Sequence, residues 1–474
     1  MRSAIRNHLG TADELLFFSK DRTPSPRKVF AHYMGSAPRS YNNVATPDGW
    51  DTAYLKVSGD SGRHAAYGGF WRDRPLERPP ITGDWQLEDA KWEILTAQKL
   101  GIEGFFTDIA GIDLASSSWN RIKKLIDAAN ELGTGFKVAP MLDRHGPAVQ
   151  TASPEDTAVA LGYFVGKASS HHLEDGRFLL SVYSIEGFPP EFWTARADAL
   201  AASSSVPVAL LGVFVTPTKM SDYLPTLAYA GIWAPGSDPA RLEVLPTPGV
   251  SLCREAGVKW LGAVQPQNVR PDQFWYDEAC NTEALRASWR RVVREEADMV
   301  QLVTWNDFRE GGQVVPSVGR GAAPAAISAF HAETWKYGGQ PLILKDTLVL
   351  SHRDQIMDAV YTSNQTKLMV ARHIAVRSPS QNLVEALTYL TEPAVVTVRI
   401  GGLPYTYLAP AGEFSMKFPS AKGTVSGYLY RAGAQIASVV SPFLVTGVPV
   451  SQDRSYFTVS THVGTAGQHP MMTL

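Results

Sequence analysis

The sequence predicts a (β/α)₈ barrel followed by a β-sandwich, and two observations support this prediction. Between residues 28 and 340, short apolar runs of strand character alternate eight times with helical segments, as in a closed parallel barrel. After residue 340 helical periodicity weakens, and short β-rich segments separated by Gly, Pro and Ser follow. An open doubly wound sheet is the alternative, but no Gly-x-Gly-x-x-Gly follows the first strand, and eight units fit the barrel better.

Each predicted barrel strand is a short run of mostly apolar residues, many of them β-branched or aromatic. The eight strands cover residues 29–34, 102–109, 136–142, 177–184, 206–215, 231–234, 259–264 and 299–304.

The helices between the strands are recognised by apolar spacing and by their end signals. Gly101 and Gly133 close the first two helices, and Ser153 followed by Pro154 opens the third as an N-cap with proline in the first turn. The predicted helices cover residues 84–100, 117–132, 153–171, 191–202, 221–230, 240–256, 282–297 and 325–337; prolines interrupt the sixth.

Three segments follow from this pattern. Residues 1–27 form a leader or docking arm, with a short helix expected over 13–18. Residues 28–340 form the barrel, and a polar, Gly-rich insertion over 36–80 is long enough to be functional or mobile. Residues 341–474 form the sandwich, which could bind carbohydrate or mediate oligomerisation; we favour structural support. A docking partner, if one exists, is expected to bind residues 1–27 or this C-terminal domain.

Composition predicts a folded protein and argues against some partners. Of the 474 residues, 44% are hydrophobic and 19% are charged, and the formal charge is −2. This balance disfavours electrostatic capture of nucleic acid or of an anionic membrane surface. No apolar run could cross a bilayer, and the N-terminus lacks the apolar core of a secretory signal. The chain therefore stays inside, leaves by another route or has lost a signal; extracellular or virion-associated action is our expectation.

The candidate site residues stand at the carboxyl ends of the predicted strands, where active sites of (β/α)₈ barrels are built. They are acids, amides and aromatics with few cations, which suits a neutral polyhydroxyl ligand. The candidate substrate-binding residues are His32, Tyr33, Asp108, Asp143, Tyr183, Glu186, Trp233, Gln265, Trp305 and Asn306. Each could instead have a purely structural role, as a core residue or a cap. For His32 a role as a core histidine is about as well supported as binding of a sugar hydroxyl.

Asp307 and Glu310 are the candidate catalytic pair. They follow the last predicted strand, beside Trp305, and Gly311-Gly312 allows a sharp turn directly after them. Two carboxylates are the minimum for cleaving a glycosidic bond, because one protonates the leaving oxygen while the other activates water or attacks directly. The alternative is a strand end followed by a solvated, charged turn.

Other chemistries are less well supported. Asp143 or Glu186 could replace one member of the pair. Asp108, Asp143 and His145 could gather around a metal ion, but no His-x-x-x-His or Cys-x-x-Cys spacing supports this, so neither metal nor cofactor is expected. No Gly-x-Ser-x-Gly signals a serine nucleophile.

Four stretches are similar to a known family: Val-Phe-Ala-His-Tyr-Met at 29–34, Leu-Gly-Ile-Glu-Gly-Phe at 100–105, Phe-Lys-Val at 136–138, and Trp-Asn-Asp-x-x-Glu at 305–310. They resemble glycoside hydrolase family 71, the α-1,3-glucanases, across most of residues 28–340 and in the β-rich tail. The resemblance implies a barrel that hydrolyses α-1,3-glucan with inversion and without a cofactor. By position it makes Glu310 the general acid and Asp307 the general base.

Two departures leave the substrate open. Residues 309–312, Arg-Glu-Gly-Gly, differ from the usual Gly-Glu-Ser of that family, and the insertion over 36–80 is unusual. The endo-α-mannosidases of family 99 have a similar Trp-Asn-acid-x-x-Glu element and are the nearest alternative. A glycan-binding barrel without activity, for instance in a virion tail, is a second alternative, and a metal-dependent hydrolase is a third.

Overall fold

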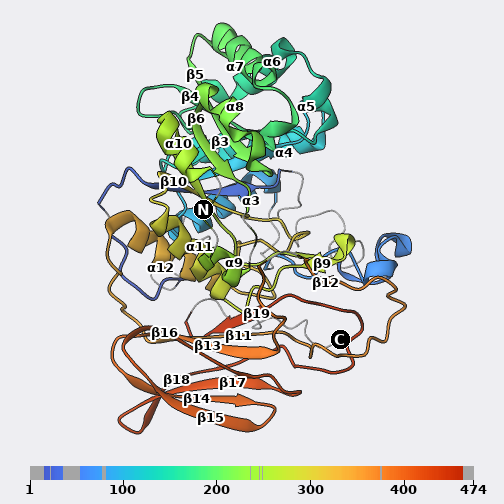
Figure 1. Ribbon diagram of the computed structural model, residues 1–474, viewed down its shortest axis with the longest axis vertical. Helices are drawn as coiled ribbons and strands as arrows, with labels where there is room; N and C mark the ends of the chain where they lie inside the picture. Colours follow the sequence, from blue (N-terminus) through green and yellow to red (C-terminus); the bar gives the residue numbers. More distant parts are fainter. Residues whose placement is uncertain are drawn as a thin grey trace.

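The computed structural model describes residues 15–21, 23–35, 54–76, 82–234, 236, 238–244, 246–247, 249–373 and 376–462. Residues 13–14 of the expected short helix, and residues 36–53 and 77–80 of the insertion, lie outside the described residues. The described chain forms a barrel with helices around it and, below it, a pair of β-sheets (Figure 1). Within this part of the chain no helix has the length and apolar content needed to cross a bilayer.

Eight parallel strands close the barrel in the order β1-β10-β7-β6-β5-β4-β3-β2. This closure confirms the predicted (β/α)₈ class over the open sheet. The strands are β1 Lys28–Tyr33, β2 Gly104–Ile109, β3 Lys137–Asp143, β4 Phe178–Tyr183, β5 Val208–Phe214, β6 Leu227–Ile232, β7 Lys259–Val264 and β10 Met299–Leu302.

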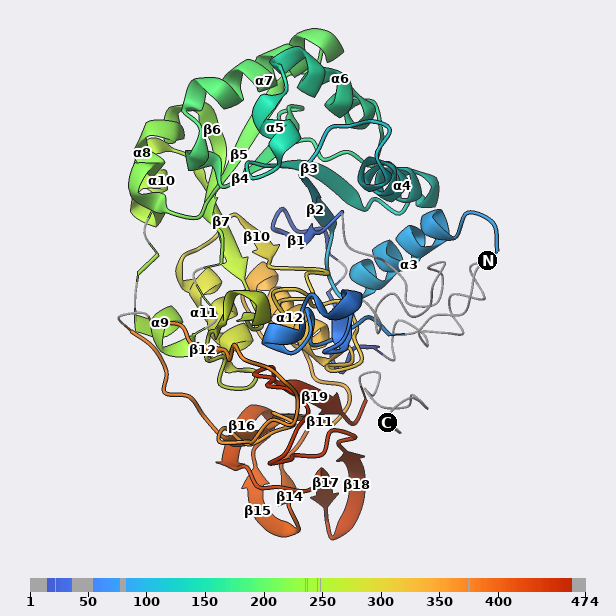
Figure 2. The same ribbon diagram turned by 90° about the vertical axis from the view of Figure 1, so that its right-hand side faces the viewer.

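Helices surround the strands on the outside of the barrel (Figure 2). Their ends follow the sequence signals: Ser116 and Ser153 accept hydrogen bonds from the Trp119 and Asp156 amides, and Gly133 closes its helix with φ of 58°. The helices are α3 Trp85–Lys99, α4 Ser117–Leu132, α5 Pro147–Thr151, α6 Pro154–Val165, α7 Pro190–Ser204, α8 Met220–Tyr223, α9 Pro239–Val244, α10 Val250–Ala256, α11 Glu283–Arg294 and α12 Ala323–Tyr337.

The sixth unit differs from its prediction. The helix expected over 221–230 ends early: α8 stops at Tyr223, a 3₁₀ turn (Leu224–Thr226) contains Pro225, and β6 begins at Leu227. The proline disfavours continuation of the helix, and β6 instead pairs with β5, with Tyr229 opposite Leu211. The helix expected over 240–256 is two helices, α9 and α10, and α6 ends at Val165 rather than near residue 171.

Side chains that point into the barrel form a separate apolar cluster. Phe30, Phe106 and Met141 belong to it, from the first three strands, together with Leu211 and Met299. Because side chains alternate along a strand, the residues two positions further along also face inward. The barrel interior therefore ends, at the carboxyl side of the strands, in the side chains of His32, Asp108 and Asp143.

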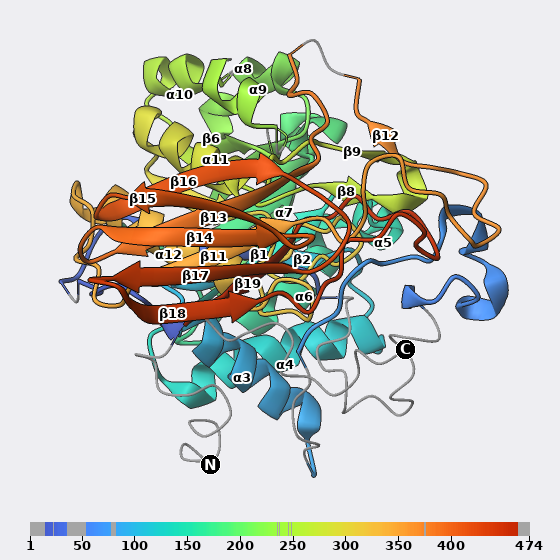
Figure 3. The same ribbon diagram turned by 90° about the horizontal axis from the view of Figure 1, so that it is seen from below.

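The C-terminal region confirms the predicted β-sandwich. Two antiparallel sheets, β16-β13-β11-β19 and β15-β14-β17-β18, lie against each other (Figure 3). A Cβ at Gly427 would lie 2.5 Å from the Leu348 side chain, so glycine permits this close approach. The strands are β11 Thr347–His352, β13 Leu383–Leu390, β14 Ala394–Ile400, β15 Leu403–Ala409, β16 Gly412–Pro419, β17 Val425–Arg431, β18 Ala434–Val440 and β19 Phe457–Ser460.

The sandwich is bound to the barrel through a buried polar interface. Arg286 of α11 lies 2.7 Å from Glu385 of β13 and 3.2 Å from Glu413 of β16. The Thr282 amide and hydroxyl also donate to Glu385. Phe17, from the segment expected to be an arm, is fully buried with its ring 4.2 Å from that of Tyr389. This part of the chain is therefore packed between the two domains.

Candidate active site

A cavity of about 510 Å³ opens at the carboxyl ends of the barrel strands. Its walls are aromatic and acidic, in keeping with the residue types that the strand ends supply. The lining residues are His32, Met34, Tyr54, Phe70, Trp71, Asp108, Asp143, His145, Tyr183, Trp233, Gln273, Asn306, Asp307, Phe308, Arg309 and Glu310.

The cavity brings together eight of the twelve residues predicted from the sequence. They are His32, Asp108, Asp143, Tyr183, Trp233, Asn306, Asp307 and Glu310. The other four, Tyr33, Glu186, Gln265 and Trp305, do not line it.

The alternation of side chains along a strand, burial and other contacts explain why these four residues do not line the cavity. Tyr33 follows the inward-facing His32, so it points to the helix layer, where its ring lies 5.0 Å from Phe105. Trp305 is fully buried, 5.3 Å from the same Phe105 ring. Glu186 instead accepts hydrogen bonds from two amides just after β5.

Gln265 is 1% exposed. The Glu186 contacts are to the Val215 and Thr216 amides, at 2.9 and 2.5 Å. In the structure neither side chain is among those that line the cavity.

Asp307 is held by the backbone of its own loop. Its Oδ1 accepts hydrogen bonds from the Arg309 and Glu310 amides at 3.0 and 3.1 Å, and its own amide donates to Thr304 Oγ1 at 2.8 Å. Burial raises the pKa of Asp307, while the two amides favour the charged carboxylate. The loop after the last barrel strand thus holds the Asp307 carboxyl group in place through hydrogen bonds to its own backbone.

Glu310 lies in the same cavity and has a strongly perturbed acidity. Burial and the neighbouring Asp307 carboxyl raise the pKa of Glu310 to about 8, although Arg270 and Arg309 oppose this. A terminal nitrogen of Arg270 lies 2.5 Å from Glu310 Oε2. Glu310 is therefore a carboxyl group that carries a proton at neutral pH, as a general acid requires.

Asp108 and Asp143 add two further carboxyl groups. Burial raises the pKa of both, and the charges of Asp143 and Asp307 raise that of Asp108 further. Asp108 lies 3.8 Å from His32 Nε2, and burial lowers the pKa of His32 to about 3, so this imidazole is neutral. Asp108, Asp143 and the neutral His32 can therefore exchange hydrogen bonds with a neutral hydroxylated ligand.

One wall of the cavity is a row of rings from the barrel strands. The Trp233 ring lies 4.8 Å from His32 and 4.7 Å from Tyr183, and Tyr183 lies 6.0 Å from His145. Asn306 plays a different part, since its Oδ1 accepts from the Met34 amide at 2.7 Å and so joins the last barrel loop to β1.

The second wall comes from the insertion, whose length and position predict an effect on the cleft but none of whose individual residues is among the predicted site residues. Tyr54 stacks on Trp71 at 4.2 Å, and Trp71 lies 6.2 Å from Phe308 of the last barrel loop. Phe70 lines the cavity beside them. The aromatic cluster Tyr-Gly-Gly-Phe-Trp at 67–71, inside an otherwise polar stretch, was the available signal.

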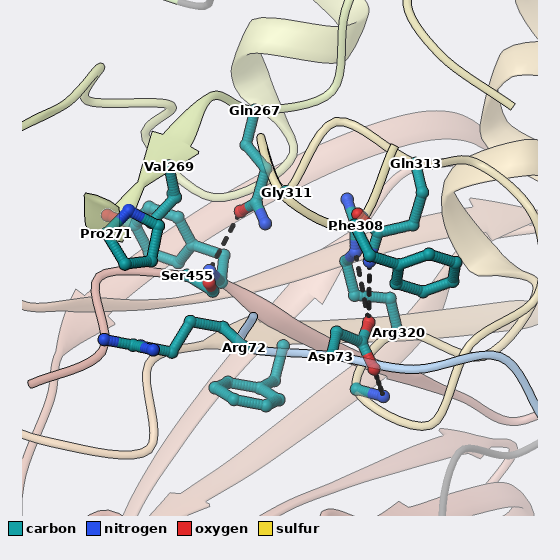
Figure 4. Close-up of a pocket in the computed structure, with 13 residues that line it drawn as sticks. Arg72, Asp73, Gln267, Val269, Pro271, Phe308, Gly311, Gln313, Arg320 and Ser455 are labelled. Carbon is teal, nitrogen blue, oxygen red and sulfur yellow. Dashed lines mark hydrogen bonds and ion pairs between the residues drawn. The ribbon is translucent and has the colours of Figure 1, made fainter. Parts of the chain in front are cut away.

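The insertion is fastened to both domains. Asp73 accepts hydrogen bonds from Gln313 Nε2 and the Gly319 amide at 2.9 and 2.8 Å. Figure 4 shows Asp73 beside Arg320 and below Gln313. Arg72 donates to the Gln452 carbonyl at 3.0 Å, close to the start of β19. The aromatic wall is therefore positioned by the barrel loop and the sandwich together.

The described residues contain no cluster of three or more His, Cys, Asp or Glu side chains arranged to hold a metal ion.

Comparison with known proteins adds sequence relatives. A model of glycosyl hydrolase family 71 matches residues 275–456, which include Asp307 and Glu310. "Glucan endo-1,3-alpha-glucosidase agn1" of Schizosaccharomyces pombe is 25% identical over 180 residues, 35% of this chain and 42% of that protein. "Mutanase Pc12g07500" of Penicillium rubens is 22% identical over 386 residues, 76% of this chain and 81% of that protein.

Among solved structures, the GH99 endo-alpha-mannosidase from Bacteroides thetaiotaomicron aligns with a TM-score of 0.49 and 13% identity. The alignment covers 66% of this chain and 98% of that one. The chain thus spans about two fifths of the length of agn1 and most of the length of the other two proteins.

Proposed function

We propose that this chain is a glycoside hydrolase acting on an α-linked glucan, specifically an endo-α-1,3-glucanase, because residues 275–456 match the model of glycosyl hydrolase family 71. The names of the two relatives, a glucan endo-1,3-alpha-glucosidase and a mutanase, support the substrate class. The observation that carries the proposal is the pair Asp307 and Glu310 in one aromatic-walled cavity.

In the proposed reaction, Glu310 donates its proton to the glycosidic oxygen as the bond to the anomeric carbon breaks. Asp307 removes a proton from water, whose oxygen bonds to the anomeric carbon from the opposite face, which inverts its configuration. The different environments support this assignment of roles. Two backbone amides stabilise the Asp307 carboxylate, whereas the raised pKa of Glu310, about 8, keeps that group protonated.

The remaining cavity residues would bind the sugar. His32, Asp108 and Asp143 are placed to exchange hydrogen bonds with hydroxyl groups, and the rings of Trp233 and Trp71 offer faces for the C–H side of a sugar ring. Inversion requires room for a water molecule, with the two carboxyl groups roughly 6.5–9.5 Å apart. Nuclear magnetic resonance of the first-formed product tests this, because an inverting enzyme releases the β-anomer from an α-linkage.

The function is tested by the release of reducing ends from a panel of α-glucans and α-mannans. We expect turnover of α-1,3-glucan, and a loss of at least about 10²-fold in kcat for Glu310→Gln and for Asp307→Asn. Glu155→Gln, an exposed acid in the first turn of α6, is the matched control and should retain activity.

The alternatives give different outcomes in the same assay. Turnover of α-mannan alone would favour the mannosidase alternative, and binding without turnover would favour a glycan-binding barrel. An active Glu310→Gln and Asp307→Asn double variant would refute the assigned pair.

A further inference from the structure

We propose that Arg270 is a positioning residue of this site: it holds the Glu310 carboxyl group and stabilises the carboxylate that proton donation leaves behind. We further propose that Arg270 is itself held by a strand from the segment between β11 and β13 of the sandwich. This inference rests on the proposed function of Glu310.

Arg270 and Glu310 are connected through both side chain and backbone. The guanidinium nitrogen lies 2.5 Å from Glu310 Oε2, and the neighbouring Val269 amide donates to the Glu310 carbonyl at 2.8 Å. The side chains are 16% and 19% exposed, so water screens this ion pair less than a surface pair. The short strand β8 (Val269–Arg270) and the proposed acid are therefore held together in space by contacts of both side chain and backbone.

Arg270 is also held by contacts with Asn268 and Trp275. Its Nε donates to Asn268 Oδ1 at 2.9 Å, and its guanidinium carbon lies 4.9 Å from the centre of the Trp275 ring. Arg372 lies 4.7 Å from the same ring centre and 2.7 Å from Asp277 Oδ2. Two guanidinium groups thus contact one indole, and each has a second polar partner that fixes its orientation.

Arg372, which contacts the Trp275 ring from the other segment, lies far along the chain from Arg270. Strand β12 (Val370–Ala371) pairs in parallel with β9 (Trp275–Tyr276), and β9 pairs with β8 in a three-stranded sheet. The Arg372 amide donates to the Tyr276 carbonyl at 2.8 Å. A segment that follows the first sandwich strand therefore completes the support of a barrel loop.

The charges facing Glu310 come from several elements. Asp307 and Asp272 raise the pKa of Glu310, and Arg270 and Arg309 lower it. Burial raises the pKa of Tyr183, and the charge of Glu310 raises it further. Arg309 is 53% exposed and lies 2.6 Å from Asp272, so much of its charge is screened or balanced. Arg270 is therefore the cation with the stronger effect on Glu310.

The direction of the effect follows from the reaction. Glu310 must be protonated to act and becomes negative as it donates, and a cation favours the negative form. Replacing Arg270 by a neutral residue should raise the pKa of Glu310 and make it a weaker acid. The alkaline limb of the pH–rate profile should then move to higher pH, while the plateau rate falls.

The experiment measures kcat/KM and kcat on α-1,3-glucan between pH 4 and 10 for the full chain. For Arg270→Gln we expect the alkaline limb to rise by about one pH unit or more, and kcat to fall about tenfold. Arg270→Lys keeps the charge and should keep the limb near its original position. Arg372→Gln should shift it in the same direction by less, because Arg270 loses its backing.

Arg254→Gln is the matched control, since Arg254 on α10 lies 3.0 Å from Glu296 in an exposed pair outside the cavity. It should change neither parameter. An unshifted or lowered limb in a folded Arg270→Gln variant overturns the inference, as does an Arg270→Lys limb that moves as far as that of Arg270→Gln. A wild-type chain without glycosidase activity overturns the proposed function instead, and this inference with it.

Discussion

Glu310 has neighbours that shift its pKa in opposite directions, and burial gives the net upward change. Burial and Asp307 raise the pKa of this carboxyl group to about 8 from an ordinary value of 4.5, against two arginines. The folded chain therefore holds a proton at Glu310 that the unfolded chain releases at lower pH. The same shift that would make this group a competent acid should also cost the fold stability as pH rises.

This cost gives a prediction for Glu310→Gln. Between roughly pH 4.5 and 8 the folded state binds the additional proton, so stability falls as pH rises through this window. The glutamine cannot ionise and removes the cost. We expect its Tm to exceed that of the wild type by about 2 °C or more at pH 8, with a smaller difference at pH 5, by differential scanning calorimetry. A constant Tm difference across this range would contradict the assigned shift.

At the scale of elements, periodicity predicted what lies within one strand or helix. Short apolar runs located the strands. The alternation of side chains along a strand, by which Phe30 and Phe106 fill the barrel in the structure, was not applied to the strand ends. The same rule, applied strictly, would have excluded Tyr33 as it retained His32. The sixth strand was predicted at 231–234, four residues late, because residues 227–230 were assigned to the preceding helix, whereas β6 covers Leu227–Ile232.

Residues that join the site through long-range contacts could not be predicted from local patterns. Trp71 reaches the cavity from the insertion, and Arg270 meets Glu310 from a different barrel loop. Neither residue belongs to a motif with fixed spacing, so only the folded structure places it beside the carboxyl groups.

The insertion wall leads to a prediction on substrate binding. Trp71→Ala removes the ring that stacks on Tyr54 and lies near Phe308, and its contact with a sugar would be made equally in the ground state and the transition state. We expect KM to rise about 3- to 10-fold with a smaller change in kcat. Tyr428→Ala, on β17 of the sandwich, removes an aromatic residue outside the cavity and serves as the control. An unchanged KM would place the substrate elsewhere.

At the scale of the whole molecule, the sandwich and the barrel share buried charges. Arg353, in the segment after β11, lies 3.1 Å from Glu278 of the barrel, and Tyr456 donates to the same carboxylate at 2.7 Å. The Arg286 contacts with Glu385 and Glu413 lie at the same interface. Groups that lose their partners would be buried without compensation, so we expect the two domains to unfold as one unit.

Arg286→Ala tests this coupling. Glu385 is fully buried, and removing its cation leaves an uncompensated charge, which typically costs about 3 to 5 kcal/mol. Arg290→Ala is a matched control on the same helix, because Arg290 pairs with Glu243 and Glu283 at 43% exposure, where such pairs contribute about 0 to 1 kcal/mol. We expect denaturant unfolding to show one transition in both variants and a large loss of stability only in Arg286→Ala. Two separate transitions, with the barrel transition unaffected, would mean that the sandwich is an independent module, and the support that β12 gives to Arg270 would then not depend on the sandwich fold.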